Sequence, residues 1–210
     1  MFNGIILAGG GNARIGCNKA LLLIDGTPII ERIISAMESV VNKIIIVVKG
    51  GDDDPIRALK NYDHNNIEII RDGFHFRNPL FGIYAGLLYS DSDYSLVLPC
   101  DTPFVNEAIL KYLLEASYGF DLTIPRWSNG YVEPLCAVYR KKSILALIND
   151  PMNMRNYSIR DVIIRLPKVR YISVDELRRF DRDLLTFYNI NTFRDYKKAL
   201  KINRKLRKGT

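Results

Sequence analysis

The sequence predicts an α/β fold with a doubly wound, mostly parallel sheet flanked by helices. Short apolar runs of strand length alternate along the first hundred residues with segments of helical periodicity. These runs are continuously apolar, as is typical of parallel strands that are buried on both faces. The alternation and the continuous runs together favour helices on both sides of the sheet.

Apolar runs in the first half are predicted as strands over 3–8, 43–48, 67–71 and 95–99. Asp25 and Gly26 form a strong turn signal after the run at 21–24. Thr27 is predicted to cap the next helix, with Pro28 at its first position, because the following apolar residues recur at helical spacing. Further helices are expected over 55–62 and 80–90.

The second half is less regular, but helices and apolar runs still alternate. A helix is expected near 106–117, others after Lys141 and Ser158, and a last one at the C-terminus. Apolar runs are found at 121–125, 135–140, 169–174 and 187–192. The loop at 125–130 and the polar segment at 149–157 are expected to frame the second side of a cleft.

Composition indicates a globular protein. The 210 residues include 48% hydrophobic and 25% charged residues, which is ordinary for a single buried domain. The apolar runs are shorter than the roughly 20 residues that cross a bilayer, and the start of the chain does not resemble a secretion signal. The three cysteines lie far apart, which favours neither a disulfide framework nor a zinc site. We therefore expect a cytoplasmic protein without a membrane partner.

The net charge of +7 comes from the end of the chain. Residues 194–210 hold eight Lys or Arg and one Asp, so 22 residues of each sign remain in 1–193. We expect one domain over 1–193 and a basic C-terminal helix or tail over 194–210. Cations near a helix C-terminus favour the helix dipole and keep the helix solvated. This interpretation argues against a nucleic-acid partner, although a tail that binds phosphate polymers stays open.

A glycine-rich loop follows the first predicted strand, within "LAGGGNARIGCNKALL" at 7–22. Gly11 and Gly16 have Walker A spacing, but Cys17 follows them in place of the Lys that this motif needs. The Rossmann pattern fails as well, since Arg14 stands where its third glycine belongs. Glycines still allow backbone N–H groups to approach anionic oxygens, and Arg14 and Lys19 can neutralise a polyphosphate.

Polar residues also follow the other predicted strands of the first half. Lys49 follows the second strand, Asp72 the third, and Asp101 lies two residues after the fourth. Because ligands of open α/β sheets bind beyond the carboxyl ends of the strands, these residues and the glycine loop are expected at one edge. Mg²⁺ is usually held by one or two carboxylates plus substrate phosphates. The sequence thus predicts a site for a phosphorylated ligand, with Asp101 as the metal ligand.

Five segments of the chain resemble the motifs of one family. The glycine loop resembles its LAGG signature with a following Arg and Lys, and "NPLFGI" resembles its GPLxGI segment. "PCDTPF" resembles PCDxP, "EPLCAVY" resembles EPLxALY, and "FYNINT" resembles FxNINT. In this order they span 7–192 and resemble the MobA-like nucleotidyltransferases, the family typified by molybdenum cofactor guanylyltransferase.

The resemblance implies a Rossmann-like nucleotidyltransferase fold and transfer of GMP from GTP to the terminal phosphate of molybdopterin, with Mg²⁺ and release of pyrophosphate. A protein that delivers the pterin is a further implied partner. Arg14, Lys19 and Asp101 would be catalytic, and Asp101 would bind the metal. The implied nucleotide contacts are Leu7, Ala8, Gly9, Gly10, Lys19, Lys49, Asp72 and Asp101. The implied acceptor contacts are Glu133, Pro134, Asn189 and Asn191.

The chain departs from the family pattern at several positions. Asn18 stands where Asp usually precedes the Lys, and Asn78 replaces the first Gly of GPLxGI. Ile15 replaces Met, Phe81 occupies a usually small position, and Lys49 stands where some members have Asn. A related nucleotidyltransferase that uses CTP, or a sugar or alcohol phosphate acceptor, therefore stays open. A non-catalytic nucleotide- or RNA-binding module is the alternative of another class.

Overall fold

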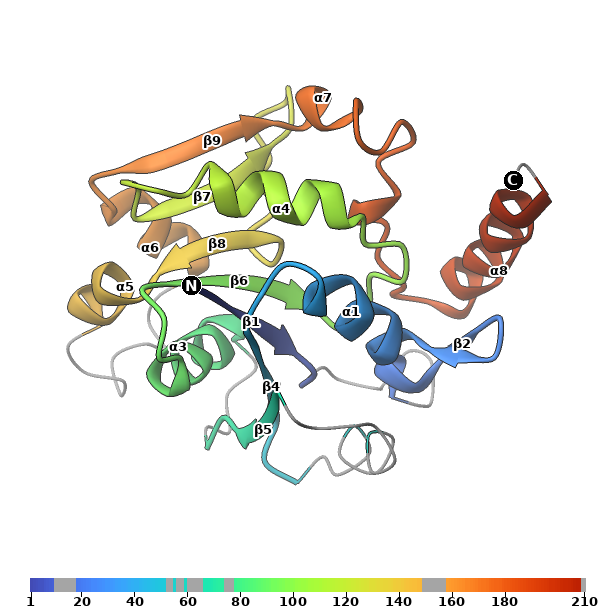
Figure 1. Ribbon diagram of the computed structural model, residues 1–210, viewed down its shortest axis with the longest axis horizontal. Helices are drawn as coiled ribbons and strands as arrows, with labels where there is room; N and C mark the ends of the chain where they lie inside the picture. Colours follow the sequence, from blue (N-terminus) through green and yellow to red (C-terminus); the bar gives the residue numbers. More distant parts are fainter. Residues whose placement is uncertain are drawn as a thin grey trace.

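The computed structural model describes residues 1–9, 18–51, 55, 59, 66–73, 78–148 and 158–208. A seven-stranded sheet runs through the molecule in the order β5-β4-β1-β6-β8-β7-β9, and Figure 1 shows these strands side by side. The strands are β1 (Phe2–Leu7), β4 (Lys43–Val48), β5 (Ile67–Arg71), β6 (Tyr94–Pro99), β7 (Leu122–Arg126), β8 (Ala137–Arg140) and β9 (Val169–Ser173). Every pairing between these strands is parallel except those of β8, which confirms the predicted mostly parallel sheet.

Helices cover both faces of the sheet, as the continuously apolar runs predicted. They are α1 (Ile29–Glu38), α3 (Pro79–Tyr89), α4 (Glu107–Glu115), α5 (Lys141–Leu147), α6 (Ile159–Arg165), α7 (Val174–Leu177) and α8 (Phe193–Lys208). Ile44 and Ile46 of β4 belong to the core cluster that contains residues of α1, α4, α7 and α8. Ile45 and Val47 belong to the other cluster, with α3, α5 and α6. Successive side chains of one strand thus fill two cores.

The predicted helix over 55–62 lies mostly outside the described residues. The other predicted helices and strands are present within one to three residues of their expected bounds, apart from the segment that precedes α1. The apolar run at 187–192 forms no strand, and a 3₁₀ turn, η5 (Leu185–Phe187), ends at its first residue.

The segment before α1 differs from the prediction. β2 (Leu23–Ile24) and β3 (Thr27–Pro28) pair as an antiparallel hairpin. Asp25 and Gly26 have φ values of 58° and 81°, which confirms the turn and is the pattern of a type I′ hairpin. The prediction that Thr27 caps the helix and that Pro28 begins it is wrong. Pro28 is still extended, with ψ of 143°, and the helix begins at Ile29 because the hairpin pairing uses the two preceding residues.

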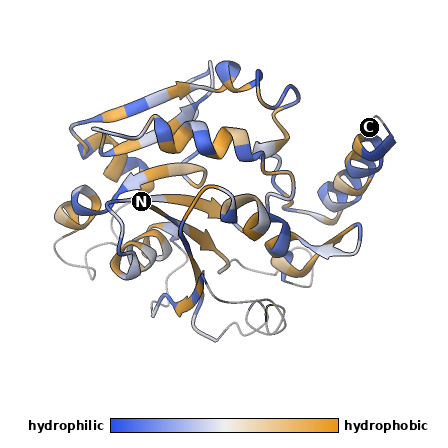
Figure 2. Ribbon diagram, viewed as in Figure 1, coloured by the Kyte–Doolittle hydropathy of each residue, from blue (hydrophilic) through white to orange (hydrophobic). Residues whose placement is uncertain are grey.

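Helix α8 packs one face on this hairpin. Ala199 is fully buried, and the Tyr196 hydroxyl donates a hydrogen bond of 2.8 Å to the Leu23 carbonyl oxygen. Arg207 pairs with Asp25 in the hairpin turn. Besides Arg207, seven exposed cations recur at helical spacing along α8, and Figure 2 shows the helix as largely hydrophilic. We call them the basic stripe: Arg194, Lys197, Lys198, Lys201, Arg204, Lys205 and Lys208.

None of the described helices combines the length and the apolar character that a membrane span requires.

Candidate active site

The carboxyl ends of β1, β4, β5 and β6 form one edge of the sheet, as predicted. Leu7, the last residue of β1, pairs with Val47 of β4 and with Pro99 of β6. Past the strand ends, the Cys100 amide donates to the Leu7 carbonyl at 3.2 Å, and the Asp72 amide donates to the Val48 carbonyl at 3.0 Å. The backbone segments that carry the predicted nucleotide residues therefore lie next to one another.

Gly9 lies directly against Lys49. A Cβ atom built on Gly9 would come within 3.0 Å of both the Cβ and the backbone nitrogen of Lys49. Ala8, just before it, is fully buried and donates a backbone hydrogen bond of 2.8 Å to the Val47 carbonyl. A side chain at position 9 would crowd Lys49, so glycine suits the close approach of these two segments of the chain. The structure thus joins the start of the glycine loop to the end of β4.

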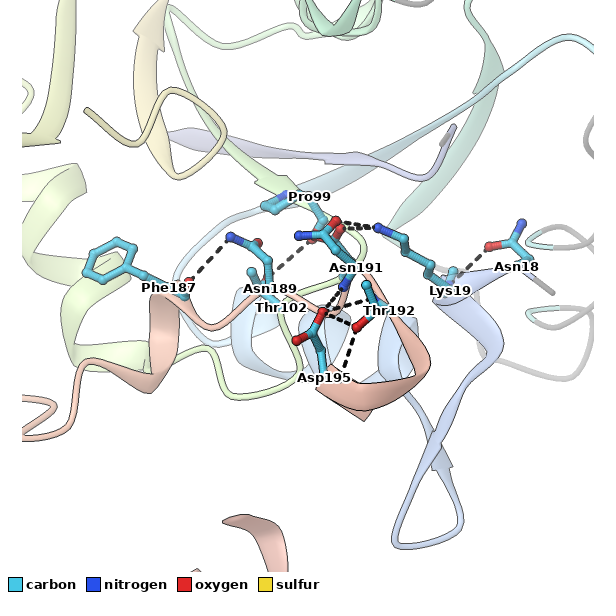
Figure 3. A network of polar contacts seen from close by, with 11 residues as sticks. Asn18, Lys19, Pro99, Thr102, Phe187, Asn189, Asn191, Thr192 and Asp195 are labelled. Carbon is cyan, nitrogen blue, oxygen red and sulfur yellow. Dashed lines mark hydrogen bonds and ion pairs between the residues drawn. The ribbon is translucent and has the colours of Figure 1, made fainter. Parts of the chain in front are cut away.

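Lys19 belongs to the polar network drawn in Figure 3. Its Nζ atom donates to Asp101 Oδ2 at 3.0 Å and to Asn191 Oδ1 at 2.7 Å. The side chains of Lys19 and Asp101 are each 18% exposed, so the ion pair is largely shielded but accessible from one side. Three segments far apart in the chain therefore meet at one ammonium group.

Asn18 positions Lys19 through the local backbone. It precedes a 3₁₀ turn, η2 (Lys19–Leu21), and its buried side-chain oxygen accepts a 3.0 Å hydrogen bond from the Ala20 amide. Asn and Asp are comparable caps because each offers an oxygen to the first free amides. The Asn at this departure from the family motif thus retains the oxygen that an Asp would supply.

The second departure, Asn78, has a similar explanation. It caps α3, its side-chain oxygen accepting a 3.0 Å hydrogen bond from the Leu80 amide, and Pro79 occupies the first helical position. Phe81 in the same motif is almost fully buried in the core cluster beneath α3.

Asp72 and Asp101 lie at opposite ends of this edge. Three steps between neighbouring strands separate β5 from β6. At about 4.8 Å a step, the two strand ends are roughly 14 Å apart. That span is several times the Mg²⁺–oxygen distance of about 2.0–2.1 Å, which favours a metal ion at one end of the edge over one bound by both carboxylates. The edge is instead long enough for an extended ligand to contact both aspartates.

Glu133 lies in the turn between β7 and β8, and its Oε1 atom accepts a 2.7 Å hydrogen bond from the Trp127 indole nitrogen. Burial raises the pKa of the Glu133 carboxyl, and the bond from Trp127 offsets part of this effect. The Trp127 ring packs edge-on against Phe187, with 5.8 Å between centroids. This contact brings the Glu133 turn beside the segment that carries Asn189 and Asn191.

The other three predicted acceptor residues lie on the same two segments. The Pro134 carbonyl accepts a 2.7 Å hydrogen bond from the buried Tyr139 hydroxyl. The Asn189 side-chain amide donates to the Phe187 carbonyl at 3.3 Å. The Asn191 side-chain oxygen accepts a 2.7 Å hydrogen bond from Lys19 Nζ.

Some predicted features lie outside the described residues, namely Gly10, Arg14 and the polar segment at 149–157. Among the residues that are described, no group of three or more His, Cys, Asp or Glu could hold a metal ion. In the contacts that the described residues make, the Asp101 carboxylate lies beside the Lys19 ammonium group.

Sequence reasoning missed the contact between Asn191 and Lys19 and the role of the residues just after Asn191. The Asp195 carboxylate accepts hydrogen bonds from the Asn191 and Thr192 amides at 3.1 and 2.8 Å. The Thr192-x-x-Asp195 spacing resembles a helix capping box and could have indicated this arrangement. The same pattern could not have indicated which side chain Asn191 contacts.

Comparison with known proteins identifies the family. A protein of Methanosarcina mazei described as a probable molybdenum cofactor guanylyltransferase is 37% identical over 194 residues, covering 91% of this chain and 86% of that protein. The molybdenum cofactor guanylyltransferase of Desulfosudis oleivorans is 36% identical over 198 residues and covers 93% of both chains.

A solved structure agrees with these relatives. The molybdopterin-guanine dinucleotide biosynthesis protein A of Archaeoglobus fulgidus superposes with a TM-score of 0.77 at 29% identity, covering 97% of this chain and 99% of that one. The model of the MobA-like NTP transferase domain matches residues 4–169. The chain therefore belongs to the MobA-like NTP transferase family.

Proposed function

We propose that this protein transfers GMP from GTP to the terminal phosphate of molybdopterin, with release of pyrophosphate. Relatives at 36–37% identity over most of the chain carry the name of this activity. The observation that carries the proposal is the Lys19 ammonium held between Asp101 and Asn191, because it joins three of the family's motifs in one anion-binding site.

The proposed reaction needs positioning and charge neutralisation more than a protein base. The acceptor phosphate is already anionic at neutral pH, so its oxygen can attack the α-phosphate of GTP without losing a proton to the protein. Lys19, with Arg14 of the glycine loop, neutralises the triphosphate and the leaving pyrophosphate. Preorganised cations of this kind typically contribute a factor of about 10²–10³ in rate.

The residues present fit a magnesium ion that is shared with the substrate. Asp101 supplies one partly exposed carboxylate at the edge where the phosphates are expected, and Mg²⁺ is usually bound by one or two carboxylates plus phosphate oxygens. A bound Mg²⁺ would neutralise charge on those oxygens. We assign this ligand role to Asp101 and no metal role to Asp72, given their separation along the edge.

The rest of the edge accommodates the nucleotide in this proposal. Leu7, Ala8, Gly9 and Gly10 line the guanine end, with Lys49 beside Gly9. Asp72 follows β5, which ends roughly 14 Å from the end of β6 by strand spacing, and it contacts the nucleotide away from the reacting phosphate.

Glu133, Pro134, Asn189 and Asn191 lie toward the pterin in this proposal. This assignment is supported by the Trp127–Phe187 contact, which brings the segment of Glu133 and Pro134 beside the segment of Asn189 and Asn191. A pterin-delivering protein and a cytoplasmic location are further expectations that follow from the proposed substrates.

The base and the acceptor are tested together. The protein is incubated with Mg²⁺, molybdopterin and one of GTP, CTP, ATP or UTP, each labelled at the α-phosphate, and with GTP in the absence of molybdopterin. We expect label in the pterin product from GTP alone. Incorporation from CTP and not from GTP would overturn the choice of base, and product from a sugar or alcohol phosphate in place of molybdopterin would overturn the acceptor. Thermal stabilisation by each nucleotide with Mg²⁺ gives an independent measure of base preference.

A further inference from the structure

Lys19 is held by a residue that the first turn of helix α8 fixes in place. Resting on the proposed function, we propose that Asp195 is a positioning residue of the nucleotide site: it holds Asn191, and Asn191 holds the Lys19 ammonium. The C-terminal helix would thereby set the geometry of the catalytic cation without itself touching the substrate.

The Asp195 carboxylate binds the start of α8 through one oxygen. Its Oδ2 atom accepts hydrogen bonds from the Asn191 amide at 3.1 Å, the Thr192 amide at 2.8 Å and the Thr192 hydroxyl at 2.9 Å. In return, the Asp195 amide donates to Thr192 Oγ1 at 3.2 Å. A usual capping box ends at the capping residue. Here the Asp195 carboxylate also accepts from the amide of Asn191, the residue before the capping Thr192, and so fixes the backbone of Asn191.

Asn191 is also fixed from its other side. The amide of Ile190, the preceding residue, donates to the backbone carbonyl of Asp101 at 2.9 Å. With its backbone tied to Asp195 and its neighbour tied to Asp101, Asn191 directs its Oδ1 atom at Lys19 Nζ, 2.7 Å away, as Figure 3 shows. Asp101 itself accepts from the same nitrogen at 3.0 Å. In the contacts made by described residues, one of the three ammonium donors thus remains for a phosphate oxygen.

Helix α8 holds the Lys19 segment by a second route. The Tyr196 hydroxyl bonds to the carbonyl of Leu23, four residues after Lys19 in the chain. Side chain and backbone of the Lys19 segment are therefore both linked to the first turn of α8.

The Asp195 carboxylate carries its charge at neutral pH. Its pKa is held below the ordinary value mainly by the hydrogen bond from the Thr192 side chain, with smaller effects of the Asn191 and Thr192 amides and of the positive charge of Lys19. The carboxylate therefore acts as an acceptor for the two backbone amides and adds negative charge near the ammonium.

The chain offers a matched control in helix α6. There Asp161 Oδ2 accepts from the Ser158 amide at 2.8 Å and from the Ser158 hydroxyl at 2.7 Å, and the Asp161 amide donates to Ser158 Oγ at 3.2 Å. Asp161→Ala and Asp195→Ala each remove a capping-box carboxylate from a helix of this protein. Of the two, only Asp195 is linked to Lys19 through described contacts.

The experiment compares the two alanine variants, and Asp195→Asn, in full-length protein. We expect Asp195→Ala to raise KM for GTP and to lower kcat/KM by about tenfold, because small misplacements of catalytic groups have large effects on rate. Asp161→Ala should stay within about twofold of the wild type, although it also loses a cap. Asp195→Asn keeps an oxygen where the three donors converge and should restore most of the loss. Equal kinetic effects of the two alanine variants would overturn the proposal.

A second measurement separates this inference from the proposed function. In the ligand-free protein, the ¹H–¹⁵N signal of the Lys19 ammonium, assigned with Lys19→Gln, should be visible because hydrogen bonds slow its exchange. It should broaden or shift in Asp195→Ala and not in Asp161→Ala. An unchanged signal in Asp195→Ala would overturn the positioning role. Absence of transfer from any nucleotide by the wild type would overturn the proposed function, while the ammonium signal would still decide the role of Asp195.

Discussion

Replacing Asp101 by asparagine tests the centre of the candidate site, because the change removes one charge and keeps the shape of the side chain. Asparagine retains an oxygen that can accept from Lys19 Nζ, now 3.0 Å from the carboxylate. It loses the negative charge that would hold Mg²⁺. Loss of one electrostatic stabiliser typically lowers turnover by a factor of about 10²–10³. We therefore expect GMP transfer to fall by that factor.

The same substitution should have a small effect on stability. At 3.0 Å and an effective dielectric constant of about 20, the gross attraction between the two charges is about 5–6 kcal/mol. Both side chains are only 18% exposed, so much of this attraction is offset by the several kcal/mol that desolvation of each ion costs. A hydrogen bond to a charged group contributes about 1.5–3 kcal/mol net, and asparagine keeps part of it. We expect the free energy of unfolding to change by less than about 2 kcal/mol.

Turnover is measured as label transferred from α-labelled GTP to molybdopterin, and stability by urea unfolding of the same preparations. The double variant Asp101→Asn with Lys19→Met shows whether the two residues act as a unit. If they do, the double variant loses less turnover than the two single variants combined. Turnover within threefold of the wild type in Asp101→Asn would refute the metal and phosphate role. A large loss of stability would refute the view that this ion pair mainly serves the reaction.

Three further changes test other parts of the structure. Glu133→Gln should be more stable than the wild type at pH 7 and equal to it near pH 3, because burial raises the pKa of folded Glu133 and Gln can still accept from Trp127. The gain in the free energy of unfolding should grow as the pH rises through the pKa of the unfolded carboxyl group. A difference in urea unfolding that does not depend on pH would contradict this. Gly9→Ala should lower the free energy of unfolding by about 1–3 kcal/mol and weaken GTP binding, because its Cβ would crowd Lys49. An unchanged free energy of unfolding and an unchanged calorimetric affinity for GTP would show that the segments of Gly9 and Lys49 can move apart. Exchanging the lysines of the basic stripe for glutamine should lower kcat/KM several-fold at low salt, and the difference should vanish near about 0.5 M salt, because exposed cations steer anionic substrates. The same salt dependence of kcat/KM in the variant and the wild type would exclude steering. Loss of salt-sensitive RNA binding in the variant would support the alternative of an RNA-binding tail.

The fold could be predicted closely because its signals lie within short contiguous stretches. The run Lys43–Val48 is apolar at every position after the first, and in the structure its alternate residues fill the two cores on either side of the sheet. Continuously apolar strands are typical of parallel sheets that carry helices on both faces, and the carboxyl ends of parallel neighbours lie at one edge. The common edge of Lys49, Asp72 and Asp101 followed from this rule.

The hairpin before α1 shows where local signals compete. Thr27 and Pro28 are good residues for the start of a helix, yet they also fit the strand that follows an Asp25–Gly26 turn. The hairpin forms because Thr27 and Pro28 pair with Leu23 and Ile24, and because the Leu23 carbonyl accepts a hydrogen bond from the Tyr196 hydroxyl of α8. Local sequence preference cannot reveal this second contact.

The sequence by itself determined the order of strands and helices, the edge of the sheet that carries the polar residues, and the motifs that belong to the family. The tertiary structure decided which of those residues touch. Lys19 and Asn191 are 172 positions apart, and their contact accompanies the docking of α8 against the hairpin of β2 and β3. The raised pKa of Glu133 likewise depends on burial. Periodicity and motif spacing describe neighbours along the chain, whereas hydrogen bonds and burial arise between segments that only packing brings together.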